Sequence, residues 1–323
     1  MLAVPRPELS VVIPTWNQIR FTRACVDSLR RNTDVAFELI IVDNGSDPAD
    51  AEEAKALADR FIGNATNLGF ARAMNQGLAV ARGEVVAFVN NDTELPASWA
   101  SRLLATLAAQ PRPGIVLPAV TAAGNQAAVR QSPADRQTIF RPFTAIPSGV
   151  IYLLVRETMV ELGGWNEQYG VASAEDLDLL FTVWANGLSV VLDEQVLVKH
   201  ESAASAVKLP DREAIYAENR LAFAARWANA DPDSVPRLTT CPKDAFAANL
   251  ETARVAGIWM EKWFTAMDIA AAETRARQAA ARKLAARKLA ARKAAASQAT
   301  AQPPGFTSRL ARKMRRVRAR IMK

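Results

Sequence analysis

An apolar segment that stops at a carboxylate is the feature that most constrains the fold of this sequence. Val85–Val89 is apolar throughout, and Asn90, Asn91 and Asp92 follow it directly. Such a segment predicts a buried strand of a parallel sheet. Ligands of open α/β sheets collect at the carboxyl ends of strands, where carboxylate and amide oxygens suit a hard divalent cation. The alternative is a loop whose Asn and Asp side chains cap a helix beginning at Ser98.

Two earlier apolar segments end in the same way. Leu9–Pro14 is followed by Thr15 and Asn17, and Phe37–Val42 runs into Asp43. Segments with helical character alternate with these strands, at 21–29, 50–60, 71–81 and 99–110. Alternating strands and helices predict an α/β fold with a mostly parallel sheet that is flanked by helices.

The second half of the chain contains further elements of both kinds. We expect strands at 114–117, 151–155, 189–192 and 196–198, and helices at 174–187 and 213–229. A helix within 244–270 carries Trp259, Trp263 and Phe264, and we expect these aromatic side chains to pack on the rest of the body. The region 121–147 is rich in Gln, Pro, Ala and Arg with poor periodicity, which indicates an irregular excursion.

Three more positions are candidates for a functional site. Gly69 begins a helix that carries Asn75, and free N–H groups at a helix N-terminus can receive a phosphate. Glu175 and Asp176 open another helix, where the alternative is that they complement the helix dipole. His200, the only histidine, follows an apolar segment and is either a ligand or a hydrogen-bonded structural residue.

Charge is distributed unevenly along the chain. The 323 residues contain 40 Lys and Arg and 33 Asp and Glu, but residues 271–323 hold 16 basic residues and a single acid, Glu273. Residues 1–270 therefore hold 24 basic and 32 acidic residues. A basic tail on an acidic body is typical of chains that meet a polyanion such as a membrane surface or a nucleic acid.

Other features of composition indicate the compartment. The two cysteines, Cys25 and Cys241, lie far apart, which fits a reducing environment. The N-terminal residues have no hydrophobic signal core, and no apolar segment is long enough to span a bilayer. We expect a cytoplasmic protein.

The order of these motifs resembles glycosyltransferase family 2, whose members have the GT-A fold. The resemblance covers roughly residues 8–225 and rests on motifs that occur in this order: Pro14-Thr15-Trp16-Asn17, Asp43-Asn44-Gly45-Ser46, Asn67-Leu68-Gly69-Phe70-Ala71, Asn90-Asn91-Asp92, Gly163-Gly164-Trp165, Glu175-Asp176 and His200. The sequence most resembles the rhamnosyltransferase-type bacterial enzymes of surface polysaccharide synthesis. The resemblance implies an α/β fold with a Rossmann-like sheet and a nucleotide-sugar donor, here a UDP- or dTDP-sugar.

The resemblance also implies roles for the residues of the motifs. Asp43 would contact the base of the nucleotide. Asp92 would bind Mg²⁺ or Mn²⁺ together with the donor diphosphate, although Asn90 stands where the family has its first carboxylate. His200 would be a second protein ligand of the metal or would contact a phosphate. Further residues would line the donor pocket: Pro14, Thr15, Asn17, Gly69, Asn75, Asn90, Asn91 and Trp165.

Transfer of the sugar also requires a base that deprotonates the acceptor hydroxyl. Asp176 matches the Asp of the family's Glu-Asp motif and is the first candidate, which implies direct displacement with inversion. Glu175 is the second candidate, and Asp178 is expected to shape the site or cap the helix. Trp165 is either a stacking platform for a sugar ring or a core residue.

Three alternative activities fit the sequence less well. A nucleotidyltransferase would need a Gly-rich phosphate loop near the N-terminus, and a dinucleotide oxidoreductase would need a Gly-x-Gly-x-x-Gly motif after the first strand. A processive synthase would have membrane helices and a Gln-x-x-Arg-Trp motif, but Phe223 precedes Arg226-Trp227 at the Gln position. The serious non-enzymatic alternative is an inactive scaffold that binds membrane or nucleic acid through its basic tail.

The resemblance and the charge pattern together divide the chain. We expect a GT-A glycosyltransferase domain over 1–235, a helical extension over 236–270 that packs on it, and a basic helical tail over 271–323. Residues 306–323 form an amphipathic pattern in which one helical face is basic and the other is apolar: Phe306, Leu310, Met314, Val317 and Ile321. This pattern predicts attachment to an anionic membrane, peripheral to its inner face, where a glycan or lipid-linked acceptor would be met. Nucleic-acid binding is the weaker alternative because no aromatic residues interleave the basic ones.

Overall fold

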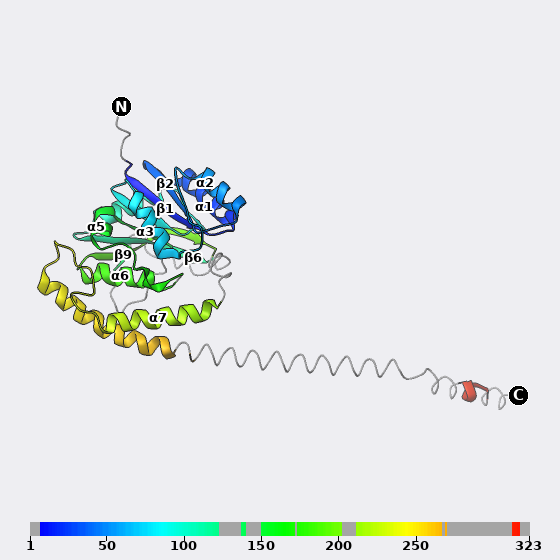
Figure 1. Ribbon diagram of the computed structural model, residues 1–323. Helices are drawn as coiled ribbons and strands as arrows, with labels where there is room; N and C mark the ends of the chain where they lie inside the picture. Colours follow the sequence, from blue (N-terminus) through cyan, green and yellow to red (C-terminus); the bar gives the residue numbers. More distant parts are fainter. Residues whose placement is uncertain are drawn as a thin grey trace. The chain divides into compact units, whose positions relative to one another are not determined.

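The chain divides into two units, Met1–Thr265 and Ala266–Lys323. The computed structural model describes residues 7–122, 137–139, 150–171, 173–201, 211–266, 269 and 312–316 (Figure 1). In the second unit the stretch 312–316 is helical with exposed side chains. The remainder of the basic tail, including most of 306–323, lies outside the described residues.

Four parallel strands form one half of the sheet in the first unit. They lie in the order β3-β2-β1-β4, and the register places Thr15 beside Asp43. Their bounds are β1 (Leu9–Thr15), β2 (Phe37–Asp43), β3 (Arg60–Gly63) and β4 (Val85–Val89). Because these strands are parallel, the polar residues that follow them meet at one edge of the sheet.

The other half of the sheet is mixed. Strand β8 (Ile151–Val155) is antiparallel to both β4 and β6 (Pro113–Ala122), and β6 is parallel to β9 (Ser189–His200). Two short strands, β5 (Thr93–Glu94) and β7 (Gln137–Ile139), pair antiparallel with β9. The antiparallel strands β5, β7 and β8 make the sheet mixed rather than wholly parallel.

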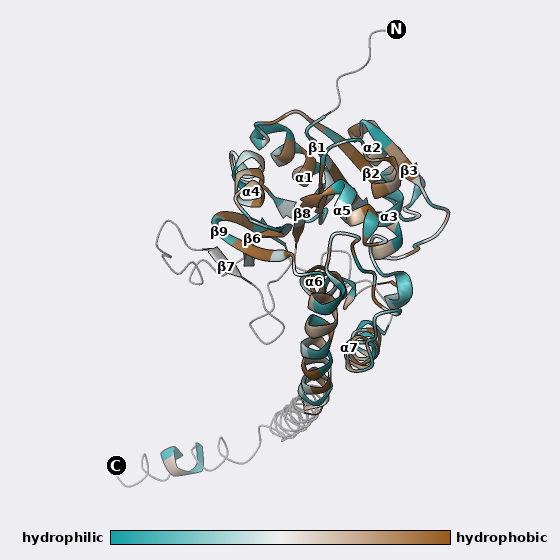
Figure 2. Ribbon diagram, turned by 90° about the vertical axis from the view of Figure 1, so that its left-hand side faces the viewer, coloured by the Kyte–Doolittle hydropathy of each residue, from teal (hydrophilic) through white to brown (hydrophobic). Residues whose placement is uncertain are grey.

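Helices cover both faces of the sheet because alternate strand residues point to opposite sides (Figure 2). One face packs on α1 (Ile19–Asn32), α2 (Pro48–Leu57) and α4 (Trp99–Ala108). The other face packs on a larger set, which comprises α3 (Phe70–Val80), α5 (Arg156–Glu161), α6 (Glu175–Ala185), α7 (Arg212–Ala228) and a helix over 243–266.

Several expected boundaries are corrected by the structure. The two strands expected at 189–192 and 196–198 are one strand, β9, and the edge strand β3 was not expected from the sequence. Strand β6 continues to Ala122, and β7 lies within the region 121–147 that we expected to be irregular. Residues 123–136 and 140–149 of that region lie outside the described part of the chain.

The helix over 243–266 packs along α7. Phe246, Leu250 and Phe264 are buried in the same core as Phe223 and Trp227 of α7. Gly257 permits this close crossing, because a Cβ there would lie 2.4 Å from the backbone nitrogen of Ala228.

The packing expectation for the aromatic residues of this helix holds for Phe264 and is wrong for its two tryptophans. Trp259 and Trp263 are 49% and 40% exposed. At about 100° per residue, Trp263 is turned about 100° and Trp259 about 140° away from Phe264, so neither shares its buried position.

Candidate active site

Asp43 is a buried carboxylate at the carboxyl end of β2 and is only 2% exposed. It accepts hydrogen bonds from the backbone N–H of Ser46, at 3.1 Å, and from the Ser46 hydroxyl. The loop after β1 closes over this turn, since Asn17 donates its N–H to Ser46 Oγ at 2.6 Å and accepts from the N–H of Asp47 at 2.7 Å. Asn17 has a φ of 54°, a left-handed conformation that is uncommon outside glycine. The ends of β1 and β2 therefore form one rigid polar corner.

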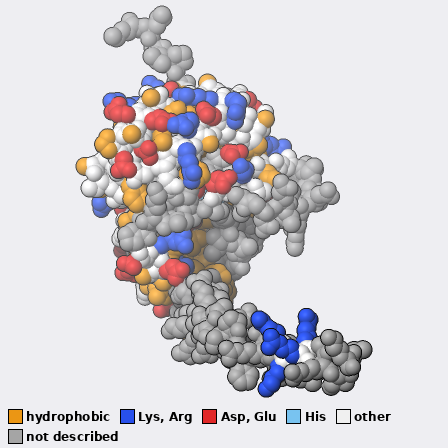
Figure 3. All heavy atoms as spheres, turned by 90° about the vertical axis from the view of Figure 1, so that its right-hand side faces the viewer, with side chains coloured by type: hydrophobic (Ala, Val, Ile, Leu, Met, Phe, Trp, Pro, Cys, Tyr) orange, Lys and Arg blue, Asp and Glu red, His pale blue; other side chains and the backbone are white. Residues whose placement is uncertain are grey.

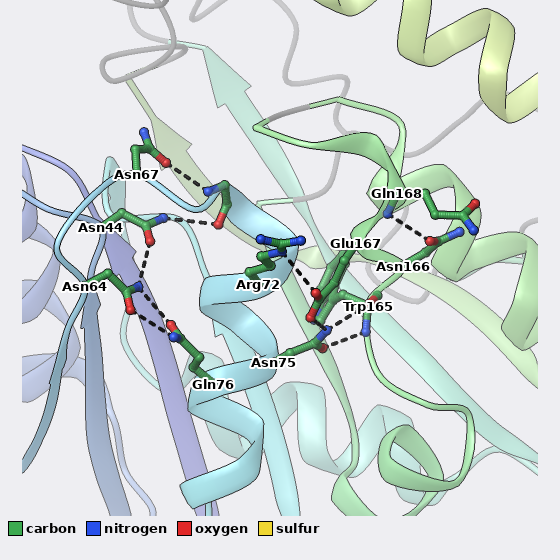
Figure 4. A network of polar contacts seen from close by, with 11 residues as sticks. Asn44, Asn64, Asn67, Arg72, Asn75, Gln76, Trp165, Asn166, Glu167 and Gln168 are labelled. Atoms are coloured by element: carbon green, nitrogen blue, oxygen red, sulfur yellow. Dashed lines mark hydrogen bonds and ion pairs between the residues drawn. The ribbon is translucent and has the colours of Figure 1, made fainter.

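Amide side chains join this corner to the start of α3 (Figure 4). Asn44 Nδ2 donates to the carbonyl of Gly69 at 3.1 Å, and Asn64 Nδ2 donates to Asn44 Oδ1 at 3.0 Å. Asn64 also exchanges two hydrogen bonds of 2.9 Å with Gln76 of α3. Because each amide fixes the next, the network holds the loop 64–69 against the carboxyl end of β2.

Gly69 brings a second loop to the same place. It has a φ of +91°, and a Cβ there would lie 2.2 Å from the carbonyl oxygen of Gly170. Phe70 donates its N–H to the carbonyl of Val171 at 3.2 Å. Close approach of backbone to backbone is therefore what requires glycine here, and the role of Gly69 in donor binding stays a prediction.

Asn75 links α3 to the loop before α6. Its Nδ2 donates to the carbonyl of Trp165 at 2.9 Å and to Glu167 Oε1 at 2.8 Å, while its Oδ1 accepts from the N–H of Trp165 at 2.8 Å. Arg72 adds an ion pair to Glu167 at 3.1 Å (Figure 4). Asn75 thus positions the loop, and its predicted contact with the donor stays a prediction.

The indole of Trp165 lies in the core beside the site. It is 2% exposed and meets the rings of Phe70, Phe88 and Tyr152 edge-on, at centroid distances of 5.2, 5.3 and 5.0 Å. Its Nε1 is buried and has no hydrogen-bond partner among the described residues. This position matches the core alternative, and stacking of Trp165 on a sugar stays a prediction.

Asp92 and His200 are brought together by strand pairing. Thr93 of β5 lies opposite His200 of β9, and His200 Nε2 lies 3.0 Å from Asp92 Oδ1. The side chain of Asn91, which precedes Asp92, is held by a hydrogen bond from its Nδ2 to Thr22 Oγ1 at 3.0 Å. The backbone N–H of Asn90 donates to the carbonyl of Val150 at 2.9 Å, which continues the hydrogen bonding between β4 and β8 by one residue. Asn90 therefore lies at the end of β4.

The atoms of Asp92 and His200 fit a divalent cation. Two ligand atoms that each lie about 2.1 Å from an octahedral ion are about 3 Å apart when they occupy adjacent positions. The separation of 3.0 Å between Oδ1 and Nε2 is a hydrogen-bond distance, which fits the structural alternative for His200, and it is also compatible with adjacent positions around an ion. Among the described residues no group of three or more His, Cys, Asp or Glu side chains could hold a metal ion.

Glu175 and Asp176 form a carboxyl pair at the start of α6, in which Glu175 is buried and Asp176 is partly exposed. Burial, and after it the charge of Asp176, raises the pKa of Glu175 to about 8. Burial also raises the pKa of Asp176, whose Oδ2 accepts a hydrogen bond from the Tyr152 hydroxyl at 3.3 Å. Tyr152 pairs with Phe88 of β4, which places the pair near the strand end that leads to Asp92. A raised pKa and convergence on a strand edge are typical of a general base.

The backbone before this pair is strained. Ala174 has a φ of 76° and is buried, in a conformation that costs a residue with a Cβ on the order of 1 kcal/mol. Oε2 of Glu175 is buried and has no hydrogen-bond partner among the described residues. Strain and an unsatisfied carboxyl oxygen in one place point to a functional site, since neither contributes to stability.

Glu175→Gln is expected to change how stability depends on pH. The folded state holds the proton of Glu175 more tightly than the unfolded state, so the free energy of unfolding of the wild type falls as pH rises from 4.5 to about 8. The Gln variant has no proton to lose and should be about 2–4 kcal/mol more stable than wild type at pH 8. Urea unfolding at pH 5 and pH 8 measures this difference. If the stability of wild type and variant depended on pH in the same way, this prediction would be contradicted. The control is Glu53→Gln, which changes a carboxylate in an exposed ion pair with Arg23.

Asp178 has a structural role, as expected for this position. Tyr169 Oη, Arg226 Nε and Trp227 Nε1 donate to its Oδ1 at 2.9, 2.8 and 2.9 Å, and Asn166 Nδ2 donates to its Oδ2 at 3.1 Å. The carboxylate is almost fully buried. Asp178 therefore fixes α6 against α7 and the 165–169 loop, which orients Glu175 and Asp176.

Comparison with known proteins identifies a family over part of this chain. The family described as Glycosyl transferase family 2 matches residues 10–148, which include the ends of β1, β2 and β4. This chain carries a glycosyltransferase family 2 region with the GT-A fold. The carboxylates Asp43 and Asp92 lie inside the family 2 region, and Asp176 lies beyond it.

Relatives of the family 2 region differ in how much of the chain they match. An uncharacterized protein of Sinorhizobium fredii, y4gI, is 28% identical over 268 residues, which cover 72% of this chain and 29% of that protein. The putative glycosyltransferase EpsH of Bacillus subtilis is 33% identical over 104 residues, which cover 31% of this chain and 30% of EpsH. The chain thus spans about 30% of the length of these two curated relatives.

A solved structure shares the fold beyond the family 2 region. The mannosyltransferase PcManGT of Pyrobaculum calidifontis, in complex with GDP-Man and Mn²⁺, aligns with a TM-score of 0.55 at 18% identity. The alignment covers 84% of this chain and 76% of that protein. The GT-A fold therefore extends past residue 148 to the strands and helices that hold Asp176 and His200.

Three parts of this site were not predicted from the sequence. Tyr152 lies inside an apolar strand, and nothing in the pattern signals its contact with Asp176. The amides of Asn64 and Gln76 lie on a loop and a helix, where such residues are common and exposed. Asn44 could have been predicted as part of the site, because it directly follows Asp43 in the turn.

Proposed function

We propose that this chain is an inverting glycosyltransferase that moves a hexosyl or rhamnosyl group from a UDP- or dTDP-sugar to a hydroxyl of a glycan or lipid-linked acceptor in surface polysaccharide synthesis. One observation carries the proposal: Asp43, Asp92 and the Glu175–Asp176 pair come from three separate segments and converge on one edge of the sheet. Each is held there by named contacts. A fold that served only as a scaffold would have no use for this convergence.

The donor side of the site is the corner made by β1 and β2. Asp43 can accept a hydrogen bond from an N–H of a pyrimidine base, and Thr15 lies beside it in register. Pro14 and Asn17 border the same corner. The fixed turn at Ser46 keeps the Asp43 carboxylate in place, so the base would meet a preorganised acceptor.

Asp92 and His200 would hold Mg²⁺ or Mn²⁺, with Asn90 and Asn91 beside them. When bound, the ion supplies a Lewis acid that stabilises the negative charge of the leaving nucleoside diphosphate. The 3.0 Å separation of their ligand atoms supports this assignment. The complex of PcManGT with GDP-Man and Mn²⁺ supports it by analogy.

Asp176 would act as the base for the acceptor. The acceptor hydroxyl loses its proton to Asp176 as its oxygen bonds to the anomeric carbon, and the bond from that carbon to the diphosphate breaks on the opposite side. This single displacement inverts the anomeric centre. The Tyr152 hydroxyl at 3.3 Å orients the carboxylate, and burial, which raises the pKa of Tyr152, keeps that hydroxyl protonated.

Binding of nucleotide sugars tests the proposal. Wild type and Asp92→Ala should be titrated with UDP-, dTDP- and GDP-sugars, with and without Mn²⁺, by calorimetry. We expect one donor to bind in a metal-dependent way and Asp92→Ala to lose about 100-fold in affinity, since a buried charged partner is removed. Glu94→Gln is the matched control. Glu94 lies only two residues after Asp92, but its carboxylate is exposed and pairs with Lys199.

Two results would overturn the proposal. Absence of binding to every donor would favour the inactive scaffold that acts through its basic tail. Equal affinity of Asp92→Ala and wild type in Mn²⁺ would remove Asp92 from the metal site.

A further inference from the structure

The helix over 243–266 presents an apolar face outward. Val255, Ile258, Trp259 and Trp263 are 52%, 47%, 49% and 40% exposed, and their spacing places them on one side of the helix. We call these four residues the tryptophan face. Figure 1 shows the helix, in yellow to orange, along the side of α7 away from the sheet.

The core fixes the orientation of this face. Leu250, Met260 and Phe264, on the opposite side of the helix, are buried against α7 in the main core. Rotation of the helix would expose them and would break the close crossing at Gly257. The indoles of Trp259 and Trp263 stack at 5.8 Å with an interplanar angle of 11°, so the two rings form one contiguous apolar patch. Exposed apolar patches of this kind mark interaction sites.

The chemistry of the face fits a lipid surface. Tryptophan is enriched at the boundary between headgroups and acyl chains because its ring is apolar and its N–H is polar. Lys262 lies between Ile258 and Trp263 on the same side of the helix, where its amine can reach lipid phosphates.

The charge of the chain favours an anionic lipid. Residues 271–323, which follow this helix directly in sequence, hold 16 Lys and Arg against one acid. Residues 312–316 hold four of these basic residues. Figure 3 shows basic side chains in this stretch, whereas acidic and basic side chains are interspersed on the visible face of the N-terminal unit.

We propose that the tryptophan face inserts into the headgroup region of an anionic membrane and that the basic tail adds electrostatic attraction to the same surface. Apolar insertion and electrostatic attraction together are what stable peripheral binding requires. In the described part of the chain no helix is long and apolar enough to cross a bilayer, and insertion of this face does not need one.

The face is linked to the carboxyl pair through α7. The Arg220 guanidinium lies 5.9 Å from the centroid of the Phe264 ring, which packs on Trp263 at 5.2 Å. One turn earlier on α7, Tyr216 lies close enough to Glu175 and Asp176 that their charges, after burial, raise its pKa.

Vesicle binding tests the proposal without donor or turnover. Full-length wild type and the double variant Trp259→Gln/Trp263→Gln should be sedimented with vesicles of phosphatidylcholine mixed with phosphatidylglycerol, and with vesicles of phosphatidylcholine alone. We expect wild type to prefer the anionic vesicles and the double variant to partition about 100-fold less, roughly ten-fold for each indole. Lipids brominated near the headgroup should quench the tryptophan fluorescence of wild type much more than that of the variant.

Matched controls separate insertion from other effects. Val160→Gln changes a residue that is 52% exposed on α5 and should leave vesicle binding unchanged. Thermal unfolding and circular dichroism should show that each variant is folded at the temperature of the vesicle assay. Val255→Glu adds a negative charge to the face without touching the indoles and should also weaken binding.

Two outcomes would overturn the proposal. If the double variant binds vesicles as tightly as wild type, the tail alone accounts for binding. If wild type sediments as a dimer without lipid and the double variant as a monomer, a second copy of the chain covers the face. The donor titration described above is independent of both outcomes, so failure of one proposal does not imply failure of the other.

Discussion

Asp176→Asn should lower kcat of sugar transfer by about 10²–10⁴-fold while leaving the affinity for the nucleotide sugar close to that of wild type. The Asn side chain has nearly the same shape and can still accept the hydrogen bond that Tyr152 donates at 3.3 Å. What it cannot do is take a proton from the acceptor hydroxyl. The measurement is initial rate with saturating donor and acceptor, together with donor affinity by calorimetry.

The pH profile provides a second readout of the same change. Burial raises the pKa of both Glu175 and Asp176, and a base must be deprotonated to act, so wild-type kcat/KM should fall as pH drops through the raised pKa values. The two carboxyls are neighbours, so the fall of kcat/KM at acid pH reports the titration of the pair and not that of either residue alone. Asp176→Asn should remove most of the activity on both sides of that limb.

Comparison of the two carboxyls identifies the base. Glu175→Gln should retain more activity than Asp176→Asn if Asp176 is the base. The opposite order would transfer the role to Glu175, whose Oε2 lacks a hydrogen-bond partner among the described residues. If both variants stayed within three-fold of wild type, the pair would have no catalytic role.

The sequence predicted the parallel strands β1, β2 and β4 because buried parallel strands have a simple signature. Leu9–Thr15, Phe37–Asp43 and Val85–Val89 are apolar segments that end in polar residues, and the structure places them as neighbours. The direction of β8 was not predictable in the same way. Ile151–Val155 has the same composition whether it runs parallel or antiparallel, and only pairing with β4 decides.

The tryptophans show why burial was harder to predict than secondary structure. Trp165 and Trp259 have the same side chain, yet one is enclosed by three aromatic rings and the other is half exposed. Helical spacing places Trp259, Trp263 and Phe264 on a helix but does not tell which side meets α7. That side is determined by Gly257, because only there can the two backbones approach closely.

Contacts between segments far apart in sequence were the least predictable part of the site. Asp92 was found from its position after β4, but its 3.0 Å contact with His200 depends on pairing across 108 positions of the chain. Asp178 and Arg226 are separated by 48 positions, and each alone resembles an ordinary helix residue. Local patterns identify candidates of this kind, and tertiary packing decides which of them meet.

Asp178→Ala should be the most destabilising single substitution proposed for this chain, with a loss of about 3–5 kcal/mol in the free energy of unfolding. It would leave Arg226, Trp227 and Tyr169 with buried donors that have lost their shared acceptor at 2.8–2.9 Å. Urea unfolding followed by circular dichroism measures the loss. The exposed pair of Arg23 and Glu53 is the matched control, and Glu53→Ala should cost less than about 1 kcal/mol.

A double variant separates the two causes of this loss. Arg226→Met removes the buried cation, so Asp178→Ala combined with Arg226→Met should be more stable than Asp178→Ala alone. If the single and double variants were equally unstable, the hydrogen bonds from Tyr169 and Trp227 would account for the loss and the ion pair would contribute little. A change of less than 1 kcal/mol in Asp178→Ala would contradict the role of this carboxylate in holding α6, and with it the account of how Glu175 and Asp176 are oriented.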